Sequence, residues 1–459
     1  MTAVEAREHI EYTEKNKKHT LFWILMVGFM LLIYVRNVMA IEFPVIIFLA
    51  YACAMMLFAD HDELMALAIS FIPFSAAFQY KYAILILIAV YILKYHKNVK
   101  NVGAFIPVLL MLAWELLHGV FGVFSFVELL RGFAELIFCS LIFSLSNKKF
   151  DYGFIARIYS ACVVFACLVA LLKLLSAVGY NFETIFLDGD YRFGIVDRDA
   201  ESYVMNYNAN ALGFMCNLSI AGLFLRTKIK GANVIDVALI IASAFFGILT
   251  LSRSFVLCFI ILMLMLMFTG GNSIYKTFKS VLVFGMAAVA IFLILYYGFP
   301  YIFDNIIKRF NEDDVTGGRS GLLVWYTEYV FSSPDRLIFG TGLQNVLDKV
   351  NLVSNIDAPF VPHNGTQEVV VVWGLPGLAL LAYFIAVVIM ESRKALERQT
   401  FSNYIPLILT LIMVQSGQLI TAGTRILMFT FLYIILCTSF EKTNNQPRGI
   451  FNERYKKNN

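Results

Sequence analysis

Three residues, each at the edge of an apolar run or in the loop between two runs, could together act on a phosphate-bearing substrate. Arg253 lies in LTLSRSF, where the turn Ser252-Arg253-Ser254 separates two apolar runs. Arg319 lies in TGGRSGLL, at the start of an expected helix, where a guanidinium and free backbone N–H groups suit phosphate. His363 lies in PFVPHNGTQEVV, directly before a third apolar run, and an imidazole suits proton transfer from a hydroxyl at neutral pH. Arginines that hold phosphate and a histidine that activates a nucleophile predict an anionic, lipid-borne substrate.

Each of these residues also has a structural interpretation. Arg253 can snorkel to lipid phosphates, Arg319 can be a solvated loop arginine, and His363 can lie outside any active site. Glu115 and His118 lie three residues apart on one helix face, which is half of a Glu-x-x-His metal set. The second copy is missing from the sequence, so a structural hydrogen bond is favoured and no metal is expected. A nucleotide P-loop is excluded because its G-x-x-x-x-G-K-[ST] spacing is absent.

The elements that must position these residues are membrane helices. The 459-residue chain is 60% hydrophobic, 15% aromatic and only 15% charged, with a mean hydropathy of +0.75. A soluble domain is about 45–50% apolar and about 25% charged, so no soluble core could bury this surface. At about 20 residues per span, about 12–14 spans would use over half of the chain. We therefore predict an all-α polytopic membrane protein with 12–14 transmembrane helices and one large outer loop between late helices.

Fourteen apolar runs are candidate spans, and the third and fourth are short enough to form one broken helix or a re-entrant pair. The runs cover about 21–35, 41–59, 64–79, 82–94, 102–121, 127–146, 154–179, 209–225, 234–250, 254–269, 281–299, 366–390, 404–421 and 426–440. All seven cysteines fall within such runs, which predicts small core residues and not a disulfide or metal set.

Basic groups between the runs set the predicted orientation through the positive-inside rule. Groups such as Arg226, Lys228 and Lys230 are expected on the cytoplasmic side, together with the N-terminal residues 1–20 and the tail 441–459. Transmembrane helices are then expected over 21–299 and 366–440. The acidic loop at Asp60, Asp62 and Glu63 fits this orientation poorly. Because the basic groups are dispersed, the net charge of +4 predicts no nucleic-acid partner.

Residues 300–365 form the largest break in the apolar pattern and are predicted to lie outside the membrane. Within them SGLLVWYTEYVF (320–331) has apolar residues at helical spacing and is expected to form an amphipathic helix on the outer face. Its Trp325, Tyr326 and Tyr329 either face sugars or lipid, or only anchor the helix at the membrane surface. The triplet Gly340-Thr341-Gly342 is too short a motif to interpret.

Together these segments resemble the motif set of the O-antigen ligase/O-antigen polymerase (Wzy) superfamily of membrane glycosyltransferases. The likeness covers roughly residues 190–390 and rests on LTLSRSFVLCFI, GGRSGLLVWYTEYVFSSPDRLIFGTGL and PHNGTQEVVVVWGLPGLALL. These match a Ser-Arg turn, an Arg-led helix with a later Gly-x-Gly, and a His-Asn before a span ending in Gly-x-x-Gly. Upstream, YRFGIV and NYNANALGF resemble the family's signature of an arginine close before a glycine and a later Asn-Ala, with Tyr207 near the place of an often-present proline.

The resemblance implies a GT-C-like fold and an inverting, metal-independent glycosyl transfer from a glycan on undecaprenyl pyrophosphate. Carried over by motif, Arg253 and Arg319 would bind the pyrophosphate, and His363 would deprotonate or position the attacking hydroxyl. Glu368 or a nearby outer Asp is the alternative base. No cofactor is implied, and the implied partners are a polyprenyl-pyrophosphate-linked oligosaccharide, membrane lipid, a flippase and a chain-length regulator. Further candidate substrate-binding residues are Arg192, Asn210, Trp325, Asn364 and Glu368.

The leading hypothesis is a repeat-unit polymerase for capsule, exopolysaccharide or O-antigen, with its active site on the outer face of the inner (plasma) membrane. A ligase that transfers the finished glycan to another acceptor shares every motif. The Lys/Asn/Phe-rich, Pro-poor composition is typical of a low-GC bacterium, in which the lipid A-core acceptor is absent, and this favours the polymerase. A transporter or flippase is less favoured. Transporters tend to show repeats and broken helices at the membrane midplane, whereas the polar features of this chain gather at the outer boundary.

Overall fold

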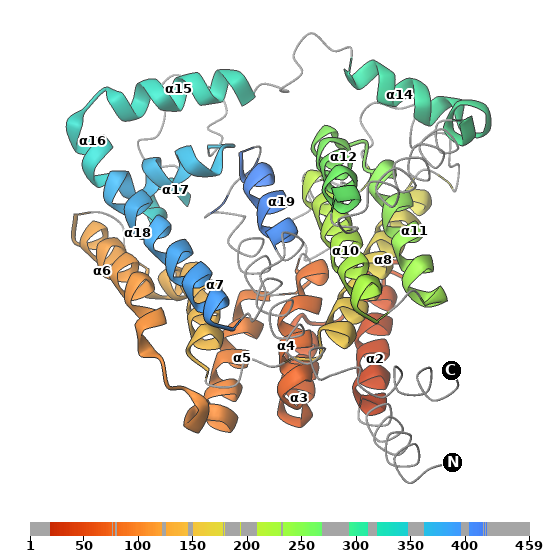
Figure 1. Ribbon diagram of the computed structural model, residues 1–459, viewed down its shortest axis with the longest axis horizontal. Helices are drawn as coiled ribbons and strands as arrows, with labels where there is room; N and C mark the ends of the chain where they lie inside the picture. The colour runs from red at the N-terminus through yellow and green to blue at the C-terminus, as the bar shows by residue number, and fades with distance from the viewer. Residues whose placement is uncertain are drawn as a thin grey trace, which may run out of the picture.

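The computed structural model is a bundle of α-helices (Figure 1). Within the described residues the chain is helical and has no strand, apart from an isolated antiparallel bridge between Val99 and Leu145. The all-α membrane fold predicted from the composition is confirmed, because five described helices are long and apolar enough to cross a membrane. The structure describes residues 19–75, 77–78, 80–121, 125–145, 150–177, 179, 193, 209–230, 233–268, 293–310, 319–347, 362–395, 404–415, 417 and 419.

The N-terminal half contributes seven described α-helices. The third apolar run is not a full span by itself, because its helix has ten residues and rises only about 15 Å at 1.5 Å per residue. The chain then turns through the 3-10 helix η1 (Ile72–Phe74) before the next long helix begins. The seven helices are α2 (Thr20–Asn37), α3 (Ile46–Phe58), α4 (His61–Ser70), α5 (Tyr80–Tyr95), α6 (Ile106–Phe121), α7 (Phe126–Ser144) and α8 (Tyr152–Ala177).

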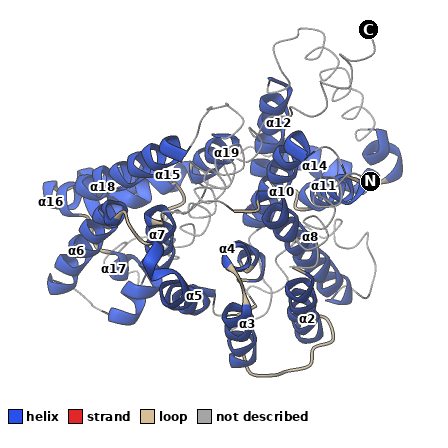
Figure 2. Ribbon diagram, turned by 60° about the horizontal axis from the view of Figure 1, so that its bottom comes forward, coloured by secondary structure: helices blue, strands red, loops and turns tan. Residues whose placement is uncertain are grey.

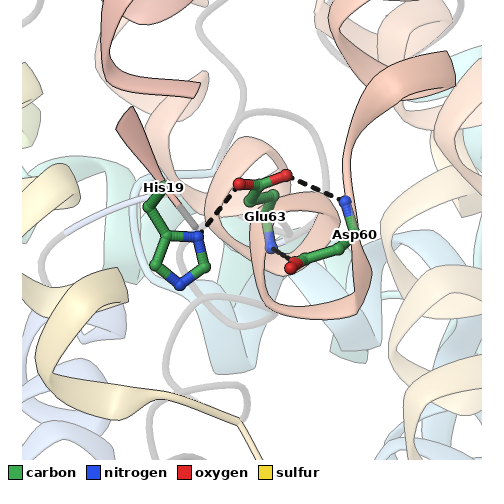
Figure 3. A group of neighbouring side chains, drawn as sticks. All are labelled: His19, Asp60 and Glu63. Atoms are coloured by element: carbon green, nitrogen blue, oxygen red, sulfur yellow. Dashed lines mark hydrogen bonds and ion pairs between the residues drawn. The ribbon is translucent and has the colours of Figure 1, made fainter. Parts of the chain in front are cut away.

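The acidic loop that fits the orientation rule poorly is a helix cap joined to α2. Asp60 Oδ1 accepts the backbone N–H of Glu63 at 2.9 Å, and Glu63 Oε2 accepts the backbone N–H of Asp60 at 2.9 Å, which forms a capping box for α4. The other oxygen of Glu63 lies 2.9 Å from His19 Nδ1 (Figure 3). The ligand atoms of the three residues lie within 4.8 Å of one another, as a metal site would require. The capping box and the hydrogen bond between His19 and Glu63 account for the contacts within this cluster.

The C-terminal half is centred on α10 (Ala209–Lys230), which packs against α8, α11 (Val234–Leu249), α12 (Arg253–Phe268) and α19 (Ile405–Val414). The region from 300 to 365, where the sequence predicted one helix, contains four in its described part. Two of them, α14 and α15, lie across one end of the bundle (Figure 1). The remaining helices are α14 (Pro300–Phe310), α15 (Arg319–Phe331), α16 (Pro334–Phe339), α17 (Leu343–Leu347) and the long α18 (Gly365–Ala395).

A buried charge cluster joins α8, α10 and α11 at the end of the bundle where α10 ends and α11 begins. Asp236 is fully buried and accepts from Arg157 Nε at 3.0 Å and from Arg226 Nη1. Arg226 also donates to the carbonyl oxygen of Gly153 at 3.1 Å. The sequence used Arg226 as a signal of orientation, and the structure shows that its side chain is only 8% exposed and pairs with Asp236. Since α10 ends and α11 begins here, Asn210 and the turn after α11 lie at the other end.

Candidate active site

Arg253 begins α12 directly after a tight turn from α11. Leu251 has a left-handed φ of 49°, so the chain reverses within the few residues between the two helices. Ser252 Oγ donates to Asn210 Oδ1 at 2.6 Å and accepts the backbone N–H of Phe255 at 3.2 Å. Ser252 is therefore both the N-terminal cap of α12 and the link to α10. This bond brings two predicted site positions, Asn210 and the Arg253 turn, together.

Two glycines allow the start of α12 to lie this close to its neighbours. A Cβ on Gly213 of α10 would lie 2.8 Å from the Cβ of Phe255. A Cβ on Gly247 of α11 would lie 2.2 Å from the ring of the same phenylalanine. The side chain of Asn217 adds a buried hydrogen bond of 3.1 Å to the carbonyl oxygen of Phe255. The helix that presents Arg253 is thus fixed against both α10 and α11.

The upstream motif YRFGIV reaches the same region through one described residue. Phe193 is 1% exposed and stacks on Phe246 of α11, with ring centroids 6.0 Å apart and ring planes 11° from parallel. Phe246 lies on the turn of α11 that precedes Leu249. Arg192, the neighbouring predicted substrate-binding residue, lies outside the described part of the chain.

His363 lies two residues before α18, and the residue after it joins α18 to α19. His363 is half-buried. Asn364 Oδ1 accepts the backbone N–H of Gln367 at 3.0 Å, which caps α18. Its Nδ2 donates to the backbone oxygen of Gln415 at 3.3 Å and to the Oε1 atom of the same residue at 3.2 Å. A Cβ on Gly365 would lie 2.5 Å from Val414, so α18 begins in tight contact with the end of α19.

Glu368, predicted as a binding residue or alternative base, is fully buried. Its Oε2 accepts the backbone N–H of Leu419. It also lies near Tyr326 of α15, whose pKa is raised to about 12 by burial, by the neighbouring Tyr329 and by the Glu368 carboxylate. A carboxylate with no exposed surface is in a position to organise the segments around it.

The helix that begins with Arg319 rests on the first turn of α18. Gln367 Nε2 donates to the carbonyl oxygen of Leu323 at 2.7 Å and to Thr327 Oγ1 at 3.0 Å. These contacts lie one and two turns after Arg319, whose side chain is outside the described part of the structure. The Arg319 helix and the helix that follows His363 are therefore joined directly.

The three aromatic residues of α15 have different environments. Tyr326 is fully buried, so the expectation that it faces sugars or lipid is wrong for this residue. Trp325 and Tyr329 are half-buried and their rings stack with centroids 6.0 Å apart. The exposed side of the helix is mixed, because Val324 and Phe331 are 58% and 69% exposed and the polar Thr327 and Glu328 are exposed as well. Exposed apolar side chains beside polar ones suit a helix at the surface of a membrane.

Helix α19 lies between the two groups of residues. It packs against α10 and α12 on one side, and on the other its end contacts Asn364 through Gln415. Two views of the bundle agree on this placement (Figures 1 and 2). The helix that begins with Arg253 and the helix that follows His363 are therefore connected through one intermediate helix.

The triplet Gly340-Thr341-Gly342 packs against α18 at its Gly-x-x-Gly motif. The close contact is between Gly340 and Gly374, and we call it the glycine joint. Both have left-handed φ values, 74° and 66°. A Cβ on Gly340 would lie 2.6 Å from the backbone nitrogen of Gly374, and one on Gly374 would lie 2.2 Å from the carbonyl oxygen of Ile338. Thr341 and Gly342 donate their N–H groups to carbonyls of α18 at 2.9 and 2.8 Å. The two motifs need glycine because their backbones touch.

Sequence reasoning missed the residues that join these helices. Ser252, Gln367 and Gln415 are polar residues beside the predicted site residues, and each makes a contact between elements. Ser252 had a usable signal, because a serine directly before an apolar run is a preferred helix cap. The partners of the two glutamines are distant in sequence, so their roles follow only from the tertiary structure.

The fold and the site define a multi-pass membrane protein whose functional candidates lie at helix starts. Residues 238–382, about a third of the chain, match the family model described as O-antigen ligase (Wzy_C). The matched segment contains Arg253, Arg319 and His363, and it confirms the resemblance to the O-antigen ligase/polymerase superfamily. The family indicates a glycosyltransferase-like enzyme that acts on lipid-linked glycans. No curated protein matches the chain.

Proposed function

We propose that the protein polymerises undecaprenyl-pyrophosphate-linked oligosaccharide repeat units, of a capsule, exopolysaccharide or O-antigen, at the outer face of the inner (plasma) membrane. The observation that carries this proposal is the family match over 238–382, which includes all three residues that the sequence assigned to the reaction. The partners proposed with it are the lipid-linked donor, membrane lipid, a flippase that delivers the donor and a chain-length regulator.

The orientation is supported by where basic residues make contacts at the helix ends. Lys94 donates to the carbonyl oxygens of Leu57 and Ala59 at 2.7 Å each, beside the capping box of α4. Arg226 and Asp236 lie where α10 ends and α11 begins. Under the positive-inside rule the helix ends that carry these basic groups belong in the cytoplasm. We therefore assign both termini to the cytoplasm and the Arg253 turn, at the far end of α11, to the outer face.

The chemistry follows from the charges on the substrate. The hydroxyl of an acceptor sugar attacks the anomeric carbon of the donor, the bond from that carbon to the pyrophosphate oxygen breaks, and the configuration inverts. The hydroxyl proton passes to His363, and the electron pair leaves with the polyprenyl pyrophosphate. Arg253 and Arg319 stabilise the charge that develops on this leaving group, which is where fixed cations contribute most to the rate. Pyrophosphate leaves readily, so alignment and cations supply most of what the reaction needs.

The contacts among the helices support one shared site. Gln367 ties the Arg319 helix to the helix that follows His363, and Asn364 ties the latter to α19, which packs against the Arg253 helix. Among the possible bases, His363 is half-buried whereas Glu368 has no exposed surface. We therefore keep His363 as the base and assign Glu368 to positioning.

A ligase is the second candidate, because the matched family is described as O-antigen ligase. Both reactions use the same donor and leaving group, and they differ only in the acceptor. The polymerase transfers the growing chain to another lipid-linked unit, and the ligase transfers it to a different acceptor.

The test incubates purified protein with undecaprenyl-pyrophosphate-linked repeat units and follows the products on a gel, with and without EDTA. A ladder of products that persists in EDTA is the expected result. A single transfer to an acceptor that is not lipid-linked would replace the polymerase with the ligase, and loss of activity in EDTA would reject the metal-independent reaction. Movement of the donor across vesicles without any new glycosidic bond would show a transporter.

A further inference from the structure

We propose that Glu115 of α6 is a positioning residue for the outer helices. It holds a strap, defined as residues 334–347 with α16, α17 and the turn between them, against α18 where the backbone of Gly374 is not helical and the helix kinks. The strap continues from α15, so this contact sets the Arg319 helix relative to the helix that follows His363. The catalytic consequence rests on the proposed function, whereas the contact itself does not.

The carboxylate of Glu115 contacts both the strap and α18. The backbone N–H of Leu343 donates to its two oxygens at 2.9 and 3.1 Å. The indole N–H of Trp373 donates to Oε2 at 2.7 Å. Glu115 is 6% exposed and lies in an apolar helix that can span a membrane. An ionisable group in such a place is a functional candidate by default, and here its acceptor oxygens face N–H donors from two other elements.

Two neighbours of Glu115 on α6, Trp114 and His118, also contact the strap, and Trp114 contacts α18 as well. Trp114 Nε1 donates to the carbonyl oxygen of Trp373 at 2.9 Å, and its indole stacks on Phe339 with planes 9° apart. His118 Nε2 lies 2.6 Å from the carbonyl oxygen of Phe339. The structural role favoured for Glu115 and His118 from the sequence therefore takes the form of a shared attachment to the strap.

The strap is joined to α15 by a short connection that side-chain contacts hold in place. Arg336 of α16 donates to Ser332 Oγ at 2.8 Å, and its guanidinium lies 4.2 Å from the ring centroid of Tyr329. The glycine joint excludes even a Cβ between the strap and α18. A shift of the strap would therefore move α15 against the first turn of α18, where Gln367 binds it.

A carboxylate suits this place better than an amide. Ionised glutamate only accepts hydrogen bonds, so both oxygens can face the N–H groups of Leu343 and Trp373. A glutamine with its amide oxygen in the place of Oε2 keeps an acceptor for both donors, but its NH₂ group then takes the place of Oε1 and faces the N–H of Leu343 at 2.9 Å. Glu115→Gln should therefore weaken the attachment although the glutamine fills nearly the same volume, and Glu115→Ala should remove it.

The first test measures hydrogen–deuterium exchange over the strap in the full-length protein, without substrate. In Glu115→Gln and Glu115→Ala we expect exchange over 339–347 to be about ten- to a hundredfold faster, because charged hydrogen bonds contribute most of this protection. Glu63→Gln is the matched control, because Glu63 is also a buried carboxylate with several partners, at the capping box of α4. Exchange over the strap should be unchanged in that control. Unchanged exchange in both Glu115 variants would overturn the contact.

The second test measures kcat and KM of the same proteins with the lipid-linked donor. Displacement of the two outer helices should lower kcat at least tenfold while the donor KM changes less, and Glu63→Gln should keep both values. Faster exchange combined with an unchanged kcat would overturn the positioning role and leave the contact in place. A wild-type protein that performs no glycosyl transfer would overturn the proposed function, and the exchange result would still decide the attachment of the strap.

Discussion

Gly340 and Gly374 touch backbone to backbone, so closely that a Cβ on the first would lie 2.6 Å from the nitrogen of the second. The contact joins a short turn of the outer region to the first third of the long helix α18. Neither glycine can be replaced without moving one of these segments, and both have the left-handed φ that only glycine adopts readily.

Gly340→Ala should therefore lower the free energy of unfolding by about 1–3 kcal/mol or more, through the combined cost of the steric clash and the strained backbone. Gly321→Ala is the matched control, because a Cβ on Gly321, inside α15, would meet nothing from the rest of the described chain within 4 Å. Alanine in that helix should be neutral or should stabilise by about 0.5–1 kcal/mol. Melting temperatures in detergent compare the two, and equal melting of both variants would contradict the joint.

Asn210→Ala should weaken the turn that presents Arg253. The substitution removes the acceptor of the Ser252 hydroxyl, at a cost of about 1–3 kcal/mol. The donor KM should rise if Arg253 binds pyrophosphate. Asn233→Ala is the control, because Asn233 caps the opposite end of α11 through a 2.9 Å bond to Ile235 and its loss costs about 0.5–2 kcal/mol. A KM that rises equally in both variants would show a general loss of stability and no effect specific to Arg253.

Tyr326→Ala should destabilise the protein because Tyr326 fills the contact between α15 and α18. Removal of a buried aromatic side chain costs about 3–5 kcal/mol. Phe331→Ala on the same helix should change stability by less than about 0.5 kcal/mol, because that ring is 69% exposed. Thermal unfolding of the two purified variants provides the comparison. A large loss of stability in Phe331→Ala with none in Tyr326→Ala would show that α15 buries its other face.

The sequence predicts the membrane fold and the starts of the important helices, because both depend on local pattern. A run of apolar residues indicates a span wherever it occurs, and Arg253 and Arg319 do begin helices as their motifs suggest. The partners of buried charges depend on the tertiary structure, so no local pattern indicates that Arg226 is paired with Asp236. The burial of Tyr326 could not be predicted either. Trp325 and Tyr329 on the same helix are also aromatic, and all three residues fit a helix that faces lipid.

Asp236→Asn tests that buried charge cluster. The substitution removes the negative charge between Arg157 and Arg226, and loss of one partner of a buried ion pair costs about 3–5 kcal/mol. Asp304→Asn, at an exposed residue of α14, should leave stability nearly unchanged. Because the cluster lies at the end away from the Arg253 turn, the surviving folded protein should keep its kcat. Unchanged melting of Asp236→Asn in detergent would refute a stabilising role for the cluster.

The proposed base and the proposed phosphate-binding residues should respond differently to substitution. His363→Ala should lower kcat by about 10²–10⁴-fold, the usual contribution of a general base, while donor binding stays nearly the same. Arg253→Lys and Arg319→Lys should instead weaken donor binding together with turnover, because lysine cannot reproduce the paired hydrogen bonds of a guanidinium to phosphate. Donor affinity and single-turnover rates, measured separately on each purified variant, distinguish the two patterns. Full activity of His363→Ala would show that another residue is the base. Full activity of Arg253→Lys and Arg319→Lys would show that only positive charge is needed at those positions.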